Sequence, residues 1–150
     1  MTTLDYSIEI DKPVTDVYAL ASQVERQPEF MPDYLSCKVI ERQPERMLLE
    51  RSAKIRGKVN VWQSWVRFRP DEGVYFTHEG GRLHGMQVNW RFQPNGPDRT
   101  RMTITQTFNV RHPIPGVGAV LERWVFAPKL SDIARRVIRS FKTLCEGDRP

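Results

Sequence analysis

The sequence predicts an α+β fold in which a seven-stranded, curved antiparallel sheet wraps around a long C-terminal helix. Three observations support this prediction. Apolar and polar residues alternate with a period of two in seven segments, turn signals separate most of these segments, and apolar residues near the C-terminus recur every three or four positions. A chain of 150 residues can bury one core, so we expect residues 1–150 to form a single domain.

The first strand and two short helices are predicted at the N-terminus. Residues 4–10 carry apolar side chains at the even positions and polar ones between them, as a half-buried strand does. Pro13 then stands where a helix begins, and apolar residues recur at helical spacing over 14–21. A second helical stretch, Gln23–Met31, is short and contains a proline, so we expect a lid-like element rather than a core helix.

Six further strands are expected between Tyr34 and Arg111, joined by short turns into a meander. An antiparallel sheet of this kind has one dry face and one wet face. The predicted spans are Leu35–Glu41, Arg46–Ile55, Val59–Arg69, Val74–Glu79, Leu83–Gln93 and Arg101–Val110. The inward positions of the last two strands are His84, Met86, Val88, Trp90 and Phe92, and then Met102, Ile104, Gln106, Phe108 and Val110.

A long amphipathic helix is predicted from Val117 to Cys145, and it would cover the dry face of the sheet. Pro128 should kink this helix or split it in two, because proline lacks a backbone donor and clashes with the preceding turn. A curled sheet of seven strands is too large for one helix to fill. The space left between them predicts an internal cavity for a ligand.

Composition and charge narrow the function classes. Apolar residues make up 39% and charged residues 27% of the chain, which is typical of a globular protein. We see no signal peptide and no membrane span in the sequence, so we expect a cytoplasmic protein. The net charge is +5, and basic residues gather near the C-terminus, either as the solvated face of the helix or as a surface for an anionic partner such as a membrane or RNA. There is no aromatic-basic RNA-binding motif, so nucleic acid is the less favoured partner.

The cysteines and histidines give no metal or cofactor signal. Cys37 and Cys145 are expected to be reduced thiols in apolar sites, although their spacing leaves a disulfide open. His78, His84 and His112 do not stand at metal-ligand spacing. We therefore expect no metal and no cofactor, and the sequence leaves monomer and homodimer open.

Two local segments and the order of elements resemble a known superfamily. Val17–Pro32 is similar to the helical opening of coenzyme Q-binding START proteins and related cyclases. Gly81–Pro94 resembles the penultimate strand of the polyketide cyclase/dehydrase and lipid transport group, which often carries a Gly-x-Trp-x-Phe-type pattern, and Thr105–Phe108 is similar to bacterial aromatase/cyclases. The chain thus resembles the START-like (SRPBCC, helix-grip) superfamily over nearly its whole length. That superfamily includes lipid carriers, quinone binders, hormone receptors, cyclases and ribosome-associated proteins, so the resemblance implies a fold more than a chemistry.

One departure weighs against the cyclase branch, which the resemblance associates with a cavity arginine in the long central strand. Aligning Trp62 and Pro70 with that strand places Val66 at the arginine position. Arg67 and Arg69 would face the other side of the sheet. A one-residue slip in register would reverse this assignment.

Polar residues at inward positions are the candidate functional groups, because a buried polar group needs a partner or a ligand. Arg51 would either pair with a carboxylate or anchor a carbonyl, phenolate or phosphate of a ligand. His84 would be a rim residue or a general base, and Gln106 would be a satisfied core amide or a donor to a ligand carbonyl. His78 shares the inward parity and the same alternatives. These three, Arg51, His84 and Gln106, are the catalytic candidates, and we find no nucleophile arrangement.

Large apolar side chains on the inward face would form either plain core or a platform for a flat ligand. Phe30 and Met31 are expected to gate the mouth of the cavity. The complete predicted ligand-binding set is Phe30, Met31, Tyr34, Arg51, Trp62, Phe76, His84, Met86, Trp90, Gln106, Phe108 and Trp124.

The leading hypothesis is non-covalent binding of a hydrophobic small molecule, such as a lipid, a quinone or a polyketide-like compound. The first alternative is a polyketide aromatase/cyclase or dehydratase that acts on a cavity-bound poly-keto substrate. The second is an interaction protein that uses its basic helix on RNA or the ribosome.

Overall fold

Seven antiparallel strands form one curved sheet in the computed structural model, which describes residues 2–31, 33–55, 57–80, 84–110 and 112–147. The strand order is β1-β7-β6-β5-β4-β3-β2, so the chain is a meander closed by pairing of the first strand with the last. The strands are β1 Thr2–Ile10, β2 Tyr34–Arg42, β3 Met47–Ile55, β4 Lys58–Arg69, β5 Gly73–Glu79, β6 Gln87–Pro94 and β7 Thr100–Phe108. The predicted α+β fold is confirmed.

The predicted alternation of faces is also confirmed in most strands. In β7 the even-numbered residues are all buried, while Thr103, Thr105 and Thr107 lie on the wetter face. The clearest difference is in β6, which begins at Gln87 rather than near residue 83. Gly85 adopts a positive φ of 83°, so the chain turns there and the strand alternation does not reach back to His84. Residues 81–83 lie outside the described part of the chain.

Between β1 and β2 lie α1, Val14–Ala21, a single 3-10 turn η1, Val24–Arg26, and α2, Gln27–Phe30. The expectation of a lid-like element over residues 23–31 is wrong. Val24 and Gln27 are buried, and the ring of Phe30 lies 5.4 Å from that of Phe141 on the C-terminal helix. This segment therefore packs against one side of the core.

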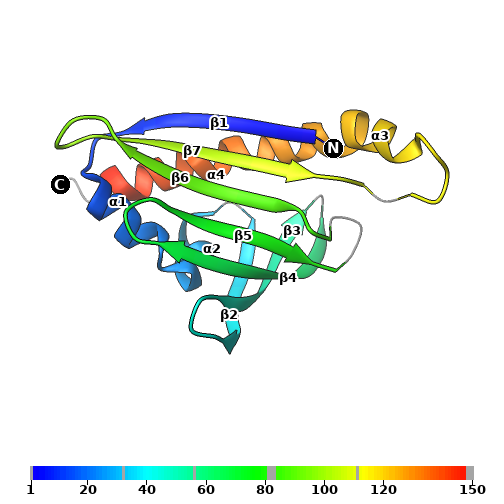
Figure 1. Cartoon of the computed structure of the whole chain (residues 1–150), viewed down its shortest axis with the longest axis horizontal. Coiled ribbons are helices and arrows are strands. Elements are labelled where there is room, and N and C mark those ends of the chain that lie inside the picture. Colours follow the sequence, from blue (N-terminus) through cyan, green and yellow to red (C-terminus); the bar gives the residue numbers. More distant parts are fainter. Residues whose placement is uncertain (1, 32, 56, 81–83, 111, 148–150) are drawn as a thin grey trace.

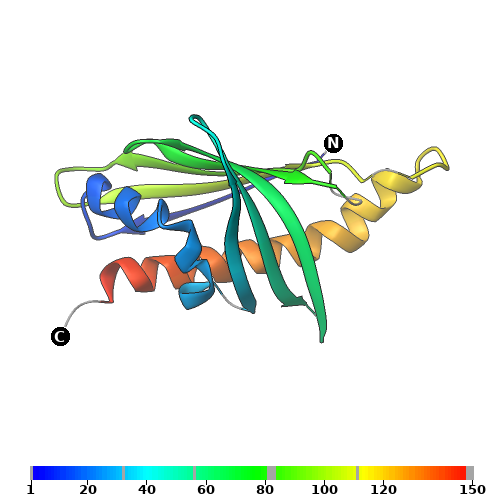
Figure 2. The same cartoon turned by 90° about the horizontal axis from the view of Figure 1, so that it is seen from below.

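The C-terminal helix runs from Val117 to Glu146 in three parts, namely α3 Val117–Leu121, the π-helical turn η2 Glu122–Phe126, and α4 Ala127–Glu146. It lies across the concave face of the sheet (Figures 1 and 2). Pro128 stands in the first turn of α4, and the π-helical turn lies directly before α4. The helix is therefore irregular next to the residue at which the sequence predicts a kink or a break. No helix in the described residues is long and apolar enough to cross a membrane.

Two apolar clusters hold the helix to the sheet. The main cluster joins the concave face to α1, α2 and α4, and includes Ile10, Trp90 and Phe141. The reduced thiols of Cys37 and Cys145 are buried within it, as the first of the two interpretations predicts. A smaller cluster around Phe108 receives Leu121 and other residues of the first helical turns.

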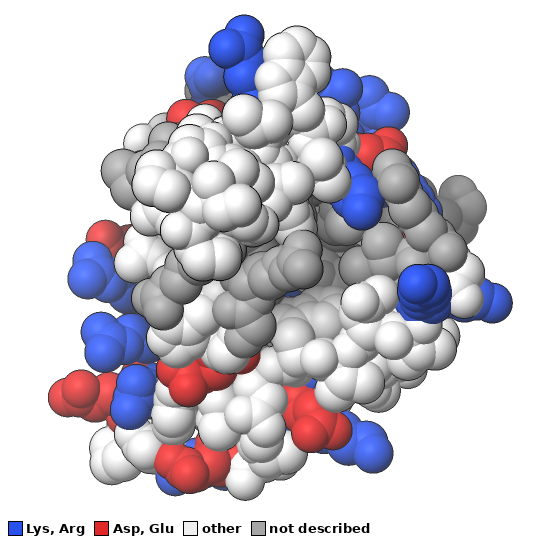
Figure 3. Space-filling model, turned by 90° about the vertical axis from the view of Figure 1, so that its right-hand side faces the viewer, with Lys and Arg blue, Asp and Glu red and all other residues white. Residues whose placement is uncertain are grey.

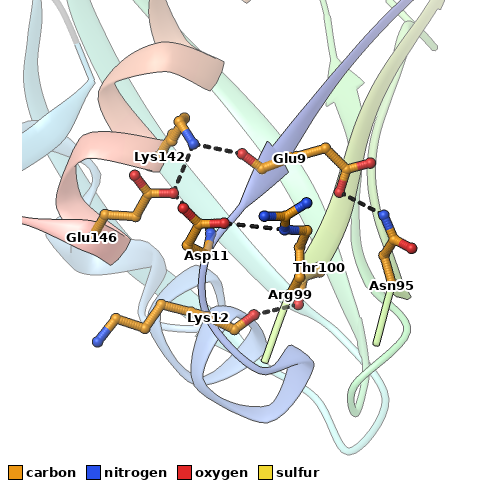
Figure 4. A network of polar contacts seen from close by, with 8 residues as sticks. All are labelled: Glu9, Asp11, Lys12, Asn95, Arg99, Thr100, Lys142 and Glu146. Carbon is orange, nitrogen blue, oxygen red and sulfur yellow. Dashed lines mark hydrogen bonds and ion pairs between the residues drawn. The ribbon is translucent and has the colours of Figure 1, made fainter. Parts of the chain in front are cut away.

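At the other end of the helix, polar contacts tie α4 to β1 and to the β6–β7 hairpin (Figure 4). The Lys142 ammonium group donates to the carbonyl of Glu9 at 2.6 Å and pairs with Glu146 at 2.7 Å. The Glu146 carboxylate also accepts from the backbone N–H of Asp11 at 2.8 Å, and Asp11 in turn pairs with Arg99 at 3.1 Å. This end of the molecule is therefore closed by side-chain contacts from three segments.

Candidate ligand cavity

A cavity of about 630 Å³ lies between the concave face of the sheet and the N-terminal half of α4. Its size falls within the range of pockets that bind small molecules. Most of its wall is apolar, with Ala53, Phe76, Trp90 and Ile104 from the sheet facing the helix. The helical side of the wall consists of Phe126, Pro128, Lys129, Leu130, Asp132, Ile133, Ala134, Arg136 and Val137. The interior is therefore hollow, as the sequence predicts.

Arg51 brings a guanidinium group into this wall from the middle of β3. Only 4% of the residue is exposed. One terminal nitrogen donates to the hydroxyl of Ser64 at 2.9 Å and the other to the amide oxygen of Gln27 at 3.3 Å. The guanidinium carbon lies 4.8 Å from the ring centre of Phe76 and 5.4 Å from that of Trp62. Arg51 is thus held in place by neutral oxygens and aromatic faces.

The alternative in which Arg51 pairs with a carboxylate is wrong for the described part of the chain, where no acidic group lies within ion-pair distance of it. Its Nε atom is buried and has no hydrogen-bond partner among the described residues. A buried cation with an unused donor is costly unless a ligand completes it.

Three more buried polar atoms in the cavity wall lack partners among the described residues. They are the ring N–H of Trp62, Nδ1 of His78 and the amide oxygen of Gln106. They come from β4, β5 and β7, and therefore from different parts of the wall. Native structures leave few such atoms unsatisfied, so together they indicate a place for polar groups of a ligand.

Burial and the nearby Arg51 cation lower the pKa of His78 from 6.5 to about 3. Burial raises the pKa of the Tyr34 phenol, an effect that Arg51 opposes and Cys37 reinforces. Burial is also the main reason why the pKa of the Cys37 thiol is raised to about 11, although Arg51 acts against it. All three groups are therefore neutral at neutral pH, and none of them offsets the positive charge of Arg51.

The cavity opens at the end of the molecule seen in Figure 3, where the surface is hollowed. Exposed residues border the opening, among them Asn60 and Val61 of β4 and Asp132 of α4, and the half-buried Lys129 lies beside them. Arg136 of α4 spans part of it, because its guanidinium pairs with Asp33 before β2 at 2.6 Å. It also contacts Asp132 at 3.5 Å.

The structure brings most of the predicted ligand-binding residues together and separates four of them. The residues that line the cavity are Met31, Tyr34, Arg51, Trp62, Phe76, Met86, Trp90 and Gln106. Phe30 packs instead against Trp90 and Phe141, and Phe108 is buried in the smaller cluster and does not line the cavity. Neither one gates or lines the opening.

His84 and Trp124 do not face inward, and both predictions are corrected. His84 is exposed in the turn before β6, where its Nδ1 accepts a hydrogen bond from the backbone N–H of Gly80 at 2.7 Å. Trp124 is 69% exposed. The prediction for Trp124 assumed a regular α-helix, but the π-helical turn has more residues per turn and rotates Glu122 and Phe126 inward instead.

Sequence reasoning missed two residues that position Arg51. Ser64 lies on the inward parity of β4, between Trp62 and Val66, so the alternation itself contained the signal. Gln27 is 1% exposed, and nothing in a short, proline-containing segment distinguishes it from a solvated glutamine. Val66, at the position that the resemblance associates with arginine, is fully buried in the apolar core.

Comparisons with known proteins agree with this architecture. Residues 10–137 match the family model for polyketide cyclase/dehydrase and lipid transport. A Streptomyces cyaneus protein that carries the provisional name polyketide cyclase is 29% identical over 113 residues, which cover 72% of this chain and 73% of that protein.

Solved structures with low sequence identity share the fold. The Zhui aromatase/cyclase from Streptomyces superposes with a TM-score of 0.86 at 13% identity, covering 97% of this chain and 93% of that one. A START superfamily protein from Mycobacterium smegmatis gives a TM-score of 0.78 at 15% identity, with 97% of each chain covered. Since the family model spans most of the sequence, the chain belongs to the polyketide cyclase/dehydrase and lipid transport family.

Proposed function

We propose that this protein binds a flat hydrophobic molecule that carries an electron-rich oxygen, such as a carbonyl, enolate or phenolate. The observation that carries the proposal is Arg51, a buried guanidinium with an unused Nε–H in an apolar cavity. The ring N–H of Trp62, which has no partner in the described part of the chain, supports the same ligand chemistry, because both groups are donors. An oxygen acceptor from the ligand would satisfy them, and the apolar wall would bury the rest of the molecule.

A polar atom on another strand of the cavity wall favours a second polar group on the ligand. The amide oxygen of Gln106 is an acceptor without a partner among the described residues. A hydroxyl or amine of the ligand would complete it. A molecule that carries both an acceptor and a donor therefore fits better than a plain hydrocarbon chain.

Two probes that share one ring system test this proposal. Anilinonaphthalene sulfonate carries an anionic group, and N-phenylnaphthylamine is its uncharged parent. We expect both probes to bind, with the sulfonate favoured, and we expect Ala53→Leu to weaken both because Ala53 lines the cavity. Ala19→Leu, the same change on the exposed side of α1, is the matched control and should leave binding unchanged.

Organic extraction of the purified protein, followed by mass spectrometry, then addresses the natural ligand. We expect an aromatic or poly-oxygenated apolar compound. If neither probe binds, or if Ala53→Leu and Ala19→Leu bind them equally, the cavity is not the binding site and the proposal is wrong.

A second candidate function is cyclisation or dehydration of a poly-keto chain. The placement of Arg51 favours this function. Arg51 lies on β3, next to the long central strand β4, and is paired with Trp62 in the sheet register. A guanidinium there would stabilise an enolate as negative charge develops on a substrate carbonyl. Turnover of a poly-β-keto thioester that is lost in Arg51→Met and reduced in Gln106→Leu would support catalysis. Binding of that thioester without turnover would favour a carrier.

A further inference from the structure

Most of the large apolar side chains that are exposed in the described residues lie at the open end of the molecule. On the helix, Val120 is 56%, Trp124 69% and Val125 40% exposed, and on β4 Val59 and Val61 are each 62% exposed. By contrast, the exposed apolar residues Leu35 and Ile40 lie on the edge strand β2. Scattered single residues need no explanation, but a concentration at one end of a molecule marks an interaction surface.

These residues flank the cavity opening. Val61 itself lines the cavity. Pro128 and Lys129 also line it, and Trp124 and Val125 stand in the turn that precedes them along the same helix. In Figures 1 and 2 the start of β4 and α3 both lie toward the end that carries the N-terminus. Figure 3 looks onto this end and shows a broad uncharged area beside the hollow.

The charge on these two segments has one sign. Lys54 and Lys58 stand on either side of the β3–β4 turn, and Arg123 and Lys129 flank Trp124 on the helix. In residues 54–62 and 112–130 the only acidic residue is Glu122. Its carboxylate is turned inward, where it accepts hydrogen bonds from Thr2 at 2.7 Å and from the backbone N–H of Val110 at 3.0 Å. Asp33 and Asp132 also lie at the opening, but both pair with Arg136, so the two apolar segments themselves carry cations and no exposed carboxylate. Apolar side chains beside cations match the interface of an anionic bilayer.

We propose that this end of the molecule docks on an anionic membrane surface, with Val120 and Trp124 in the headgroup region and the cavity opening turned toward the lipid. Tryptophan suits this position, since its ring is apolar and its N–H remains hydrated. A hydrophobic ligand would then enter or leave the cavity without crossing water. That transfer rests on the proposed function, whereas the docking itself does not.

Sedimentation with sucrose-loaded vesicles tests the docking. We expect the full chain to sediment with vesicles of equal parts phosphatidylglycerol and phosphatidylcholine, to bind pure phosphatidylcholine more weakly, and to be released by salt. The double variant Val120→Ser/Trp124→Ser should bind the anionic vesicles at least about tenfold more weakly, because it loses the apolar anchor. Ile40→Ser removes a similarly exposed apolar residue from β2 and should bind like the wild type.

Vesicle binding that is absent in the wild type, or equal in the double variant, would overturn the proposal. So would vesicle binding that Ile40→Ser abolishes while its circular dichroism spectrum is unchanged. Titration of N-phenylnaphthylamine without vesicles, on the same preparations, separates the two proposals. Probe binding without vesicle binding leaves the cavity function standing and overturns the membrane docking alone.

Discussion

Arg51 is the residue at which folding and binding are in conflict. It replaces an apolar side chain on the inward face of β3, between Leu49 and Ala53, and its charge is buried without a carboxylate among the described residues. The hydrogen bonds to Ser64 and Gln27 offset part of the desolvation cost. A residue that stability alone would not select is a strong indication of function.

The variant Arg51→Met separates these two roles. Methionine has a similar length and is apolar, so we expect the melting temperature to stay the same or to rise. Affinity for anilinonaphthalene sulfonate should fall about tenfold or more, while affinity for its uncharged parent should change little. Thermal melts and fluorescence titrations measure the two effects. Arg67→Met, on the outer face of β4, should leave the affinity for both probes unchanged. Equal losses of sulfonate affinity in the Arg51 and Arg67 variants would contradict the role assigned to Arg51.

His78 contributes a pH dependence to stability. Its pKa in the folded protein is about 3, and an unfolded histidine titrates near 6.5. Below pH 6.5 the unfolded chain therefore binds a proton that the folded chain does not, so stability falls as the pH drops from 6.5 toward 3. We expect His78→Phe to flatten the decline in melting temperature over this window. The exposed His112→Gln variant should keep the wild-type slope; a His78→Phe slope as steep as the wild type would show that other groups cause the decline.

At the scale of elements, the strands and most of the helix face could be predicted from the sequence, since Val137, Ile138 and Phe141 of α4 are buried as the helical spacing predicts. Period-two alternation specifies which strand residues face inward, and the structure agrees along β1 and β7, whereas β2 contains two register shifts and the turn at Gly85 ends the alternation before β6. In the helix, the same kind of reasoning fails at the π-helical turn, where the extra residue in the turn leaves Trp124 exposed and turns Glu122 and Phe126 inward. Nothing in a local apolar pattern reports where that extra residue is placed.

Glu122 holds this π-helical turn to the start of β1 and the end of the sheet. Burial raises the pKa of its carboxyl, but hydrogen bonds from the Val110 backbone N–H and the Thr2 hydroxyl lower it, and the net direction is downward. We expect Glu122→Gln to lower the free energy of unfolding by about 1–2 kcal/mol at neutral pH, since a charged acceptor becomes a neutral one. Urea denaturation measures this change. Because the pKa in the folded state is depressed, the difference should shrink as the pH falls below about 4.5. A difference that stays constant down to pH 3 would contradict an ionic role.

Across the whole molecule, the sequence predicts the hollow interior because it predicts both of its walls. It does not predict which polar atoms are left without partners. The histidine that enters the cavity is His78 rather than His84, and the difference depends on where a turn ends. Whether a buried polar atom has a hydrogen-bond partner depends on which strands, distant in sequence, lie beside it in the fold.

The two ends of the molecule differ in how they are closed, and this leads to a kinetic prediction. Two exposed ion pairs of similar accessibility are available for comparison. Arg136–Asp33 lies at the cavity opening, and Arg99–Asp11 lies at the end fixed by the Lys142 network. Exposed pairs contribute at most about 1 kcal/mol, so Arg136→Met and Arg99→Met should both unfold at nearly the wild-type urea concentration.

Only the pair at the opening should affect ligand exchange. Arg136 connects α4 to the segment before β2 across the mouth, so its removal should speed the dissociation of N-phenylnaphthylamine several-fold, whereas Arg99→Met should leave the rate unchanged. The uncharged probe is chosen so that the lost charge does not itself alter binding. Stopped-flow displacement measures both rates. Equal rates in the two variants would mean that the ligand passes through another part of the wall, because a contact that does not lie on the exit route cannot slow release.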